Sequence, residues 1–297
     1  MKQILCIAEV CCDIIFGQLN KIPILGEEEY CKYFSVKAGG GANTAMGLAR
    51  LKVPTKLLTR IGDDEIGHIV MENLFKSGLD ISQVVMKKGV GTPVSAVMST
   101  KEDRCFASFS GDQSPFVTID QLEQAIKETD HVHTYLGYCL HYPIVEICKK
   151  YNKTLSVDTS WMDGADLKGI EPILSYCSLF TPNDKEAMAL TGMGCPESAL
   201  LHLSKLVPGV VITMGEQGSI ALMNDKIHRQ KSVVYGEAVD STGAGDLFCS
   251  GLLYGFVNGF NLEKSIEIAS HTAGLSVTYY GGIDDKFTIE IFEKMLS

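Results

Sequence analysis

The strongest candidate for chemistry is a short loop near the C-terminus, where residues 240–246 read DSTGAGD and an apolar run follows over 247–255. Gly243 and Gly245 permit backbone conformations that larger side chains forbid. The buried helix predicted behind the loop begins with unpaired N–H groups and a partial positive charge, which suits a phosphate or the charge that develops in phosphoryl transfer. Asp246 beside this anion site is placed to accept a proton from an attacking hydroxyl. The alternative is an ordinary turn in front of a helix, capped by a hydroxyl side chain of the loop.

A second glycine-rich stretch opens into a predicted helix over residues 38–51. Gly39, Gly40 and Gly41 let a ligand approach the backbone, and Asn43 behind them offers both a donor and an acceptor. This combination fits the hydroxyls of a sugar, and the alternative is a glycine hinge at the base of a lid. The spacing is not the GxGxxG of a dinucleotide site, and the chain contains no Walker-type phosphate loop.

Two further candidates follow predicted strands, where open α/β sheets gather their ligands. Asp13 comes after an apolar first strand expected over residues 3–10, so it is a candidate for binding substrate hydroxyls, with a capping aspartate as the alternative. Asn183 and Glu186 stand three apart at a predicted helix start, where an amide oxygen and a carboxylate suit Mg²⁺ held through its waters. A capping box uses the same residue types at the same spacing, so the spacing alone favours the cap.

These candidates depend on a framework of alternating strands and helices, which predicts a mainly parallel sheet covered on both faces. Two stretches of apolar–polar alternation, at about 14–38 and 90–110, interrupt that framework and predict a small antiparallel sheet that serves as a lid. We therefore expect a single α/β domain over residues 1–297 that carries this lid. The other predicted strands are 55–61, 132–136, 155–158, 178–181 and 209–213, and the predicted helices include 141–151, 166–174, 183–190, 198–207, 243–258, 262–279 and 288–296.

Composition excludes several classes of protein. A net charge of −10 without a Lys/Arg cluster argues against nucleic-acid binding. No stretch reaches about 18 consecutive apolar residues, so no membrane span is expected, and the early acids Glu9 and Asp13 argue against a signal peptide. The ten cysteines form no CxxC pair and no metal-ligand spacing, which is typical of free thiols in a cytoplasmic protein.

Four stretches, taken in order, resemble the signatures of the ribokinase-like (PfkB) carbohydrate kinases, and the resemblance extends over essentially the whole chain. It implies a ribokinase-like three-layer α/β/α domain with a small β lid. It also implies a kinase that uses Mg²⁺ and ATP, with K⁺ as an activator in some members. The implied acceptor is a small sugar, and a nucleoside kinase and a non-catalytic sugar-binding regulator are the alternatives. The four stretches are GGGAN at 39–43, IGDDEIG at 61–67, TPNDKE at 181–186 and DSTGAGD at 240–246.

The resemblance also implies roles for individual residues. Asp246 is implied as the catalytic base, and Asn183 and Glu186 as residues that help to hold Mg·ATP. Asp240 and Thr242 match positions that surround a monovalent cation in potassium-activated members. The implied anion hole is Gly243, Ala244 and Gly245; the implied sugar site is Asp13, Gly39, Gly40, Gly41 and Asn43; and the implied nucleotide side is Thr213, Gly215, Gly218, Ser270, His271 and Gly274.

Two departures from the family pattern bear on the acceptor. Ribokinases usually carry a lysine where Gly40 stands, which puts ribose itself in doubt. No arginine follows Asp158, as it often does in fructokinases and sugar-acid kinases, so a phosphorylated or carboxylated acceptor bound in that way is disfavoured. Arg104 on the lid is a candidate for part of that role, with an exposed strand-edge arginine as the alternative. The lid strands also have edges, so a homodimer through the lid is a further hypothesis.

Overall fold

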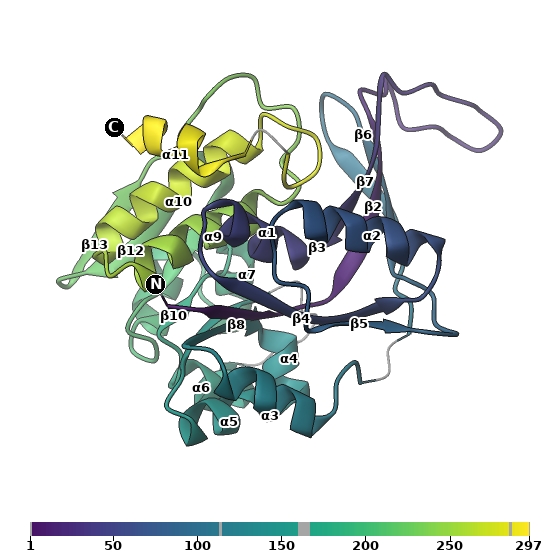
Figure 1. The fold of residues 1–297 in the computed structure, drawn as a ribbon. Helices are drawn as coiled ribbons and strands as arrows, with labels where there is room; N and C mark the ends of the chain where they lie inside the picture. The colour runs from purple at the N-terminus through teal and green to yellow at the C-terminus, as the bar shows by residue number, and fades with distance from the viewer. Residues whose placement is uncertain (1, 113–114, 160–166, 285–286, 297) are drawn as a thin grey trace.

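The computed structural model describes residues 2–112, 115–159, 167–284 and 287–296, and at its centre six parallel strands form a sheet. Their order is β10-β9-β8-β1-β4-β5 (Figure 1). All four residues of β1 are buried because helices cover both faces of the sheet, which explains why this strand is apolar throughout instead of alternating. The strands are β1 Ile4–Ile7, β4 Thr55–Gly62, β5 Val84–Lys87, β8 His131–Tyr135, β9 Thr154–Asp158 and β10 Leu179–Phe180.

A three-stranded antiparallel sheet, in the order β11-β12-β13, continues this framework beside β10. A parallel bridge between Phe180 and Val210 joins the two sheets. The sequence pattern does not predict β12 and β13, because β13 is mostly polar and shows no clear alternation. The signal that marks this hairpin is its turn, where Asn224 and Asp225 have positive φ values of 50° and 60°. The strands are β11 Val211–Thr213, β12 Ser219–Met223 and β13 Lys226–Gln230.

Helices cover the central sheet on both faces, so the domain has the expected α/β/α layers (Figure 1). Each face carries its own core of buried side chains. The first core is formed with α1 Ala42–Arg50, α2 Glu65–Lys76, α9 Ala244–Val257, α10 Leu262–Ser276 and α11 Ile289–Leu296. The second is formed with α3 Ile119–Lys127, α4 Leu136–His141, α5 Ile144–Lys150, α6 Leu167–Leu174, α7 Asp184–Thr191 and α8 Pro196–Leu203.

Helix α9 follows the loop at 240–246, and small residues set its position against α10. A Cβ added to Gly251 would lie 2.4 Å from the hydroxyl oxygen of Thr272 on α10, and one added to Gly255 would lie 2.4 Å from that of Ser265. The backbone of α9 at these two glycines therefore packs directly against side chains of α10. A larger residue at either position would force the two helices apart. This contact fixes the start of α9, and with it the loop in front.

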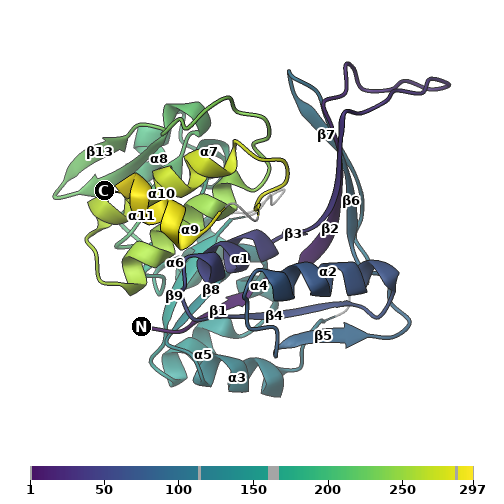
Figure 2. The same ribbon diagram turned by 45° about the horizontal axis from the view of Figure 1, so that its top comes forward.

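The lid is a four-stranded sheet in the order β3-β2-β6-β7, which stands away from the central sheet (Figure 2). Its outer pairs are antiparallel, but β2 and β6 run parallel, so the lid is a mixed sheet and not the purely antiparallel one expected. The strands are β2 Val10–Gly17, β3 Tyr33–Gly40, β6 Val94–Ser99 and β7 Arg104–Phe109.

The first predicted strand needs a correction that moves Asp13. The apolar run over 3–10 is two strands, because β1 ends at Ile7 and β2 of the lid begins at Val10. The break is marked only by Glu9, a single charged residue between two apolar stretches, so the pattern does not show that a second sheet begins there. Asp13 therefore lies within β2, opposite Lys37 of β3, and not after the end of a central strand.

Other boundaries differ in smaller ways. The helix expected over 141–151 is α5, which begins only at Ile144, and an unpredicted short helix, α4, precedes it over Leu136–His141. The helix expected over 262–279 ends at Ser276. The predicted elements do not include β5 and α3. All ten cysteines are free, as expected, and among the described helices none combines the length and apolar character that crossing a membrane requires.

Candidate active site

The loop before α9 adopts a conformation that requires glycine. Gly243 is the N-cap residue of α9, with a φ of +74°, and a Cβ on it would lie 2.4 Å from the Cα of Gly282. Asp240 is buried behind this loop, where its carboxylate accepts hydrogen bonds from the N–H groups of Thr242 (2.9 Å) and Gly281 (2.8 Å). Asp240 thus ties the loop to the segment around Gly281, and Gly243 and Gly245 line a cleft in front of the helix.

Asp246 lies in the first turn of α9 and faces the same cleft. Its carboxylate accepts hydrogen bonds from the hydroxyls of Tyr135 (3.0 Å) and Thr44 (3.2 Å) and from the amide of Asn43 (3.4 Å). Burial raises the pKa of Asp246 to about 6, and these three donors oppose the rise because they favour the charged form. The carboxylate is therefore ionised at neutral pH and still basic enough to take a proton.

The tyrosine at this carboxylate predicts a shift in the pH dependence of the reaction. We expect kcat/KM of the wild type to fall below about pH 6, where Asp246 takes up a proton. Tyr135→Phe removes a donor to the charged form, so the acid limb should move up by about one pH unit. Rates of ADP release from pH 5 to 9 measure this midpoint. Tyr176→Phe, which removes a hydroxyl that donates to Lys153, is the control, and a common midpoint for all three proteins would contradict the expectation.

Asp13 and Gly39 of the predicted sugar site pack directly against each other. Asp13 is buried, accepts a hydrogen bond from the thiol of Cys11 (3.3 Å), and has a pKa raised mainly by burial. A Cβ on Gly39 would lie 2.0 Å from a carboxylate oxygen of Asp13. The Asp13 carboxylate therefore occupies the space that a side chain at position 39 would fill. Gly40 and Gly41 line the cleft itself, whereas Asp13, Gly39 and Asn43 lie directly behind its lining residues.

This packing predicts the result of adding one methyl group. Gly39→Ala should displace the Asp13 carboxylate and raise the KM for the acceptor at least tenfold, as estimated from a lost charge-assisted hydrogen bond, while the KM for ATP stays unchanged. Steady-state kinetics with each substrate varied in turn measures both constants. Gly169→Ala on α6 is the control, because a Cβ there meets no atom within 4 Å. An equal rise in both constants would point to general damage and contradict this role.

Arg104 connects the lid to the loop before α9. Its guanidinium donates to the hydroxyl of Ser241 and lies 4.0 Å from a carboxylate oxygen of Asp240. It also lies 5.7 Å from the ring centre of Phe106 on the same strand. Arg104 stands on β7, an edge strand of the lid, and its side chain is 30% exposed, so the position at a strand edge is as the alternative describes it. Arg104 also lines the cleft, and its role toward the acceptor stays a prediction.

Asn183 and Glu186 form the capping box that their spacing favours, and both also line the cleft. Each side chain accepts a hydrogen bond of 2.9 Å from the backbone N–H of the other. The hydroxyl of Thr159 donates to the same Glu186 oxygen. Among the described residues no group of three or more His, Cys, Asp or Glu side chains could hold a metal ion. A magnesium ion here would need further oxygens from water and phosphate, and the expected contact through water stays a prediction.

The nucleotide candidates separate into two groups. Thr213 lines the cleft, and Gly215 and Gly218 bound a one-turn 3₁₀ helix directly after it. The three candidates on α10 do not line the cleft. Ser270 is buried and donates to the carbonyl of Ile266, His271 bonds the hydroxyl of Tyr235, and a Cβ on Gly274 would lie 2.4 Å from the carbonyl oxygen of Val233.

Sequence reasoning leaves out some residues that the structure places at the cleft. Tyr135 and Thr44 bond Asp246, and Asp158 lies beside them with its carboxylate accepting from the thiol of Cys249 (3.2 Å). Burial, followed by the charges of Asp246 and Glu186, raises the pKa of Asp158 to about 7. Tyr135 and Asp158 are the last residues of β8 and β9, so the rule that ligands gather at the carboxyl ends of strands would have found both.

The cleft has a volume of about 620 Å³ between the lid and the carboxyl end of the central sheet. It brings together the loop at 240–246, which is called the anion loop for its predicted role, and the two glycines at the end of β3, Gly40 and Gly41. A comparison with known protein families agrees with this geometry. The sequence model of the family described as "pfkB family carbohydrate kinase" matches residues 1–288. The chain belongs to the pfkB family of carbohydrate kinases. It is therefore a phosphotransferase that acts on a sugar hydroxyl, and ATP is the co-substrate of these kinases.

Individual relatives place the chain within this family without fixing its acceptor. It is 26% identical over 284 residues to the ATP-dependent 6-phosphofructokinase of Thermoanaerobacterium thermosaccharolyticum, covering 90% of this chain and 86% of the relative. It is 28% identical over 253 residues to the nucleoside kinase of Methanothermobacter thermautotrophicus, covering 82% of this chain and 79% of the relative. The structure of Arabidopsis thaliana ribokinase with ribose and ATP superimposes with a TM-score of 0.83 at 23% identity, covering 99% of both chains, and confirms the ribokinase-like fold.

Proposed function

We propose that this kinase transfers the γ-phosphoryl group of Mg·ATP to a hydroxymethyl or hydroxyl group of a small sugar, with Asp246 as the base. The observation that carries the proposal is the Asp246 carboxylate, which faces the cleft in the first turn of α9 with three donors and a pKa of about 6. The N–H groups of Gly243, Ala244 and Gly245 form the proposed anion hole. They meet the charge that develops on the γ-phosphoryl oxygens, and the lid excludes water.

The sugar would bind beneath the lid, with its reacting hydroxyl against Asp246. Asp13 and Asn43, with the backbone of Gly39, Gly40 and Gly41, are the proposed partners of its other hydroxyls. A sugar hydroxyl has a pKa far above 7, so Asp246 takes the proton only as the new P–O bond forms. Positioning and fixed dipoles supply the catalysis, since no covalent intermediate is needed.

Two cation sites belong to this proposal. Asn183 and Glu186 face the cleft and suit Mg²⁺ held through water, which would neutralise charge on the phosphate oxygens. A monovalent cation such as K⁺ fits the loop behind, because the Thr242 hydroxyl is buried there with no hydrogen-bond partner among the described residues. The buried carboxylate of Asp240 lies two residues away and supplies the opposite charge.

The test is ADP release from Mg·ATP across sugars, sugar acids and nucleosides, with and without K⁺. ADP that depends on a sugar supports the main proposal. Turnover only with a nucleoside would favour the second candidate, which the similarity to a relative named nucleoside kinase supports. Tight sugar binding without any ADP would instead indicate a regulator that has lost catalysis.

A homodimer through the lid is the proposed assembly. Three aromatic side chains of the lid, Phe34, Phe106 and Phe109, are 59%, 53% and 58% exposed, and β3 and β7 are the free edges of the lid sheet. Burial of exposed rings and pairing of open strand edges both favour association. A mass near 32.3 kDa by light scattering at working concentration would contradict the dimer.

A further inference from the structure

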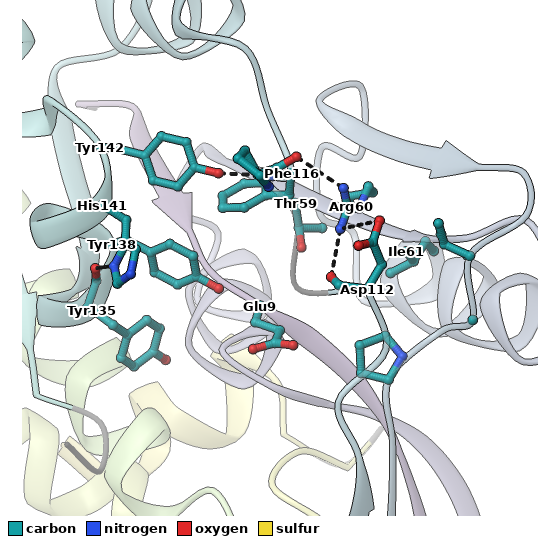
Figure 3. Close-up of a pocket in the computed structure, with 16 residues that line it drawn as sticks. Glu9, Thr59, Arg60, Ile61, Asp112, Phe116, Tyr135, Tyr138, His141 and Tyr142 are labelled. Atoms are coloured by element: carbon teal, nitrogen blue, oxygen red, sulfur yellow. Dashed lines mark hydrogen bonds and ion pairs between the residues drawn. The ribbon is translucent and has the colours of Figure 1, made fainter. Parts of the chain in front are cut away.

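A second cavity of about 490 Å³, the side cavity, adjoins the active-site cleft (Figure 3). The two share four lining residues, which are Glu9, Pro93, Tyr135 and Tyr138. Tyr135 connects them chemically, because its side chain lines both and its hydroxyl donates to Asp246. A substituent carried by a sugar at Asp246 would therefore extend into the side cavity.

One wall of the side cavity is a cluster of three aromatic rings. The ring centre of Phe116 lies 5.3 Å from that of Tyr138 and 5.3 Å from that of Tyr142, at interplanar angles of 83° and 67°. The hydroxyl of Tyr142 also accepts a hydrogen bond of 2.9 Å from the backbone N–H of Phe116. Edge-to-face packing and this bond hold the rings in place, so the wall is formed before any ligand arrives.

Two of the residues that line the side cavity, Arg60 and His141, have basic side chains, and Arg60 is already engaged by the wall of the cavity. The guanidinium of Arg60 donates to the carbonyls of Pro115 (3.1 Å) and Asp112 (2.8 Å), and it lies 3.3 Å from the Asp112 carboxylate (Figure 3). Its side chain is only 6% exposed. The guanidinium of Arg60 is therefore engaged by Asp112 and Pro115, and the Asp112 carboxylate offsets its charge toward an incoming anion.

Two acidic residues line the side cavity, Glu9 and Asp112, and Asp112 is paired with Arg60. Glu9 is therefore the acid whose carboxylate can interact with a ligand. It lies between β1 and β2, lines both cavities, and none of the described residues donates a hydrogen bond to its carboxylate. Its exposed surface faces the cavity, while protein on its other sides raises its pKa and the charge of Arg60 opposes that rise. A carboxylate beside aromatic rings attracts a cation through both charge and the ring faces.

We propose that the side cavity binds a positively charged amine that the acceptor sugar carries as a substituent. This inference rests on the proposed kinase function, because the sugar must lie against Asp246 for its substituent to reach Glu9. The acceptor class is then an amine-substituted sugar. An anionic substituent would be repelled by the charge of Glu9, and Arg60 is already paired with Asp112. The cavity volume leaves room for a short alkyl chain around the amine.

The test compares two probes that differ by charge and keep the same length. They are the 1-butylamino-1-deoxy and 1-O-butyl forms of D-fructose and of D-ribulose, and binding is measured by calorimetry so that turnover is not needed. On at least one framework the amine should bind the wild type at least about tenfold more tightly than the ether. Glu9→Gln should abolish that ratio, whereas Glu72→Gln, at an exposed acid on α2, should keep it.

Each outcome is decisive. An amine that binds no more tightly than its ether on both frameworks overturns the proposal, and so does a ratio that Glu9→Gln leaves intact. ADP release from the same probes is scored separately. A charge-dependent ratio without ADP from any sugar would count against the proposed kinase chemistry and leave the amine site standing, so the two failures can be told apart.

Discussion

Asp246→Asn should lower kcat by about 10³-fold or more, roughly 4 kcal/mol of transition-state stabilisation. Asparagine keeps the size of the side chain and can still meet Tyr135 and Thr44, but it cannot take the proton of the attacking hydroxyl. The KM for ATP should change little, because the anion loop is untouched. Single-turnover ADP formation at saturating substrates measures the chemical step directly.

The matched control is Asp120→Asn, since Asp120 is also an acid in the first turn of a helix, α3, but is exposed to solvent. It should keep the wild-type rate and melting temperature. A residual rate within tenfold of wild type for Asp246→Asn would contradict its role as the base. Asp158 would then be the next residue to test, because its carboxylate lines the same cleft.

Gly243→Ala should be the most damaging change to the anion loop, in both stability and rate. A φ of +74° costs a residue with a side chain about 1–2 kcal/mol, and the added Cβ would meet the Gly282 Cα at 2.4 Å, where backbone cannot give way easily. We expect a fall of more than about 2 kcal/mol in the free energy of unfolding. A displacement of the loop by about 1 Å should lower kcat about 10²-fold.

Gly245→Ala is the control for the stability effect. It lies two residues further on, inside α9, and a Cβ there meets no atom within 4 Å. Its melting temperature should equal or exceed that of the wild type, since alanine favours a helix over glycine. Urea unfolding of the two variants compares them, and equal losses would show that any side chain in this loop is harmful, contrary to the specific requirement at Gly243.

Local sequence patterns predict most of the fold and the loop at 240–246 that lines the cleft. These features are predictable because each depends on residues only a few positions apart. The pattern places the glycines and Asp246 at the start of one long apolar helix, and in the structure Gly243 is the N-cap of α9 while Gly245 and Asp246 lie in its first turn. The position of Asp13 is different. Whether an apolar run continues as one strand or passes into a second sheet depends on which strands pair with it, and that is a long-range property.

Residues that act through tertiary contacts are also beyond local patterns. Tyr135 and Asp246 are 111 residues apart, and no feature of either sequence neighbourhood shows that they touch. Asn183 and Glu186 show a second limit, since a cap and a metal site use the same residue types at the same spacing. The structure forms the cap, and both residues also line the cleft, so forming the cap does not remove them from the proposed magnesium site.

The side cavity and the anion loop are built from separate parts of the chain, and this has a consequence for evolution. The aromatic wall comes from residues 116, 138 and 142, whereas the loop and its base come from 240–246. Substitutions in the wall can therefore change the accepted substituent while the machinery for phosphoryl transfer stays intact. A lineage can explore new acceptors without passing through an inactive intermediate, which fits relatives at 26% and 28% identity that are named for different acceptors.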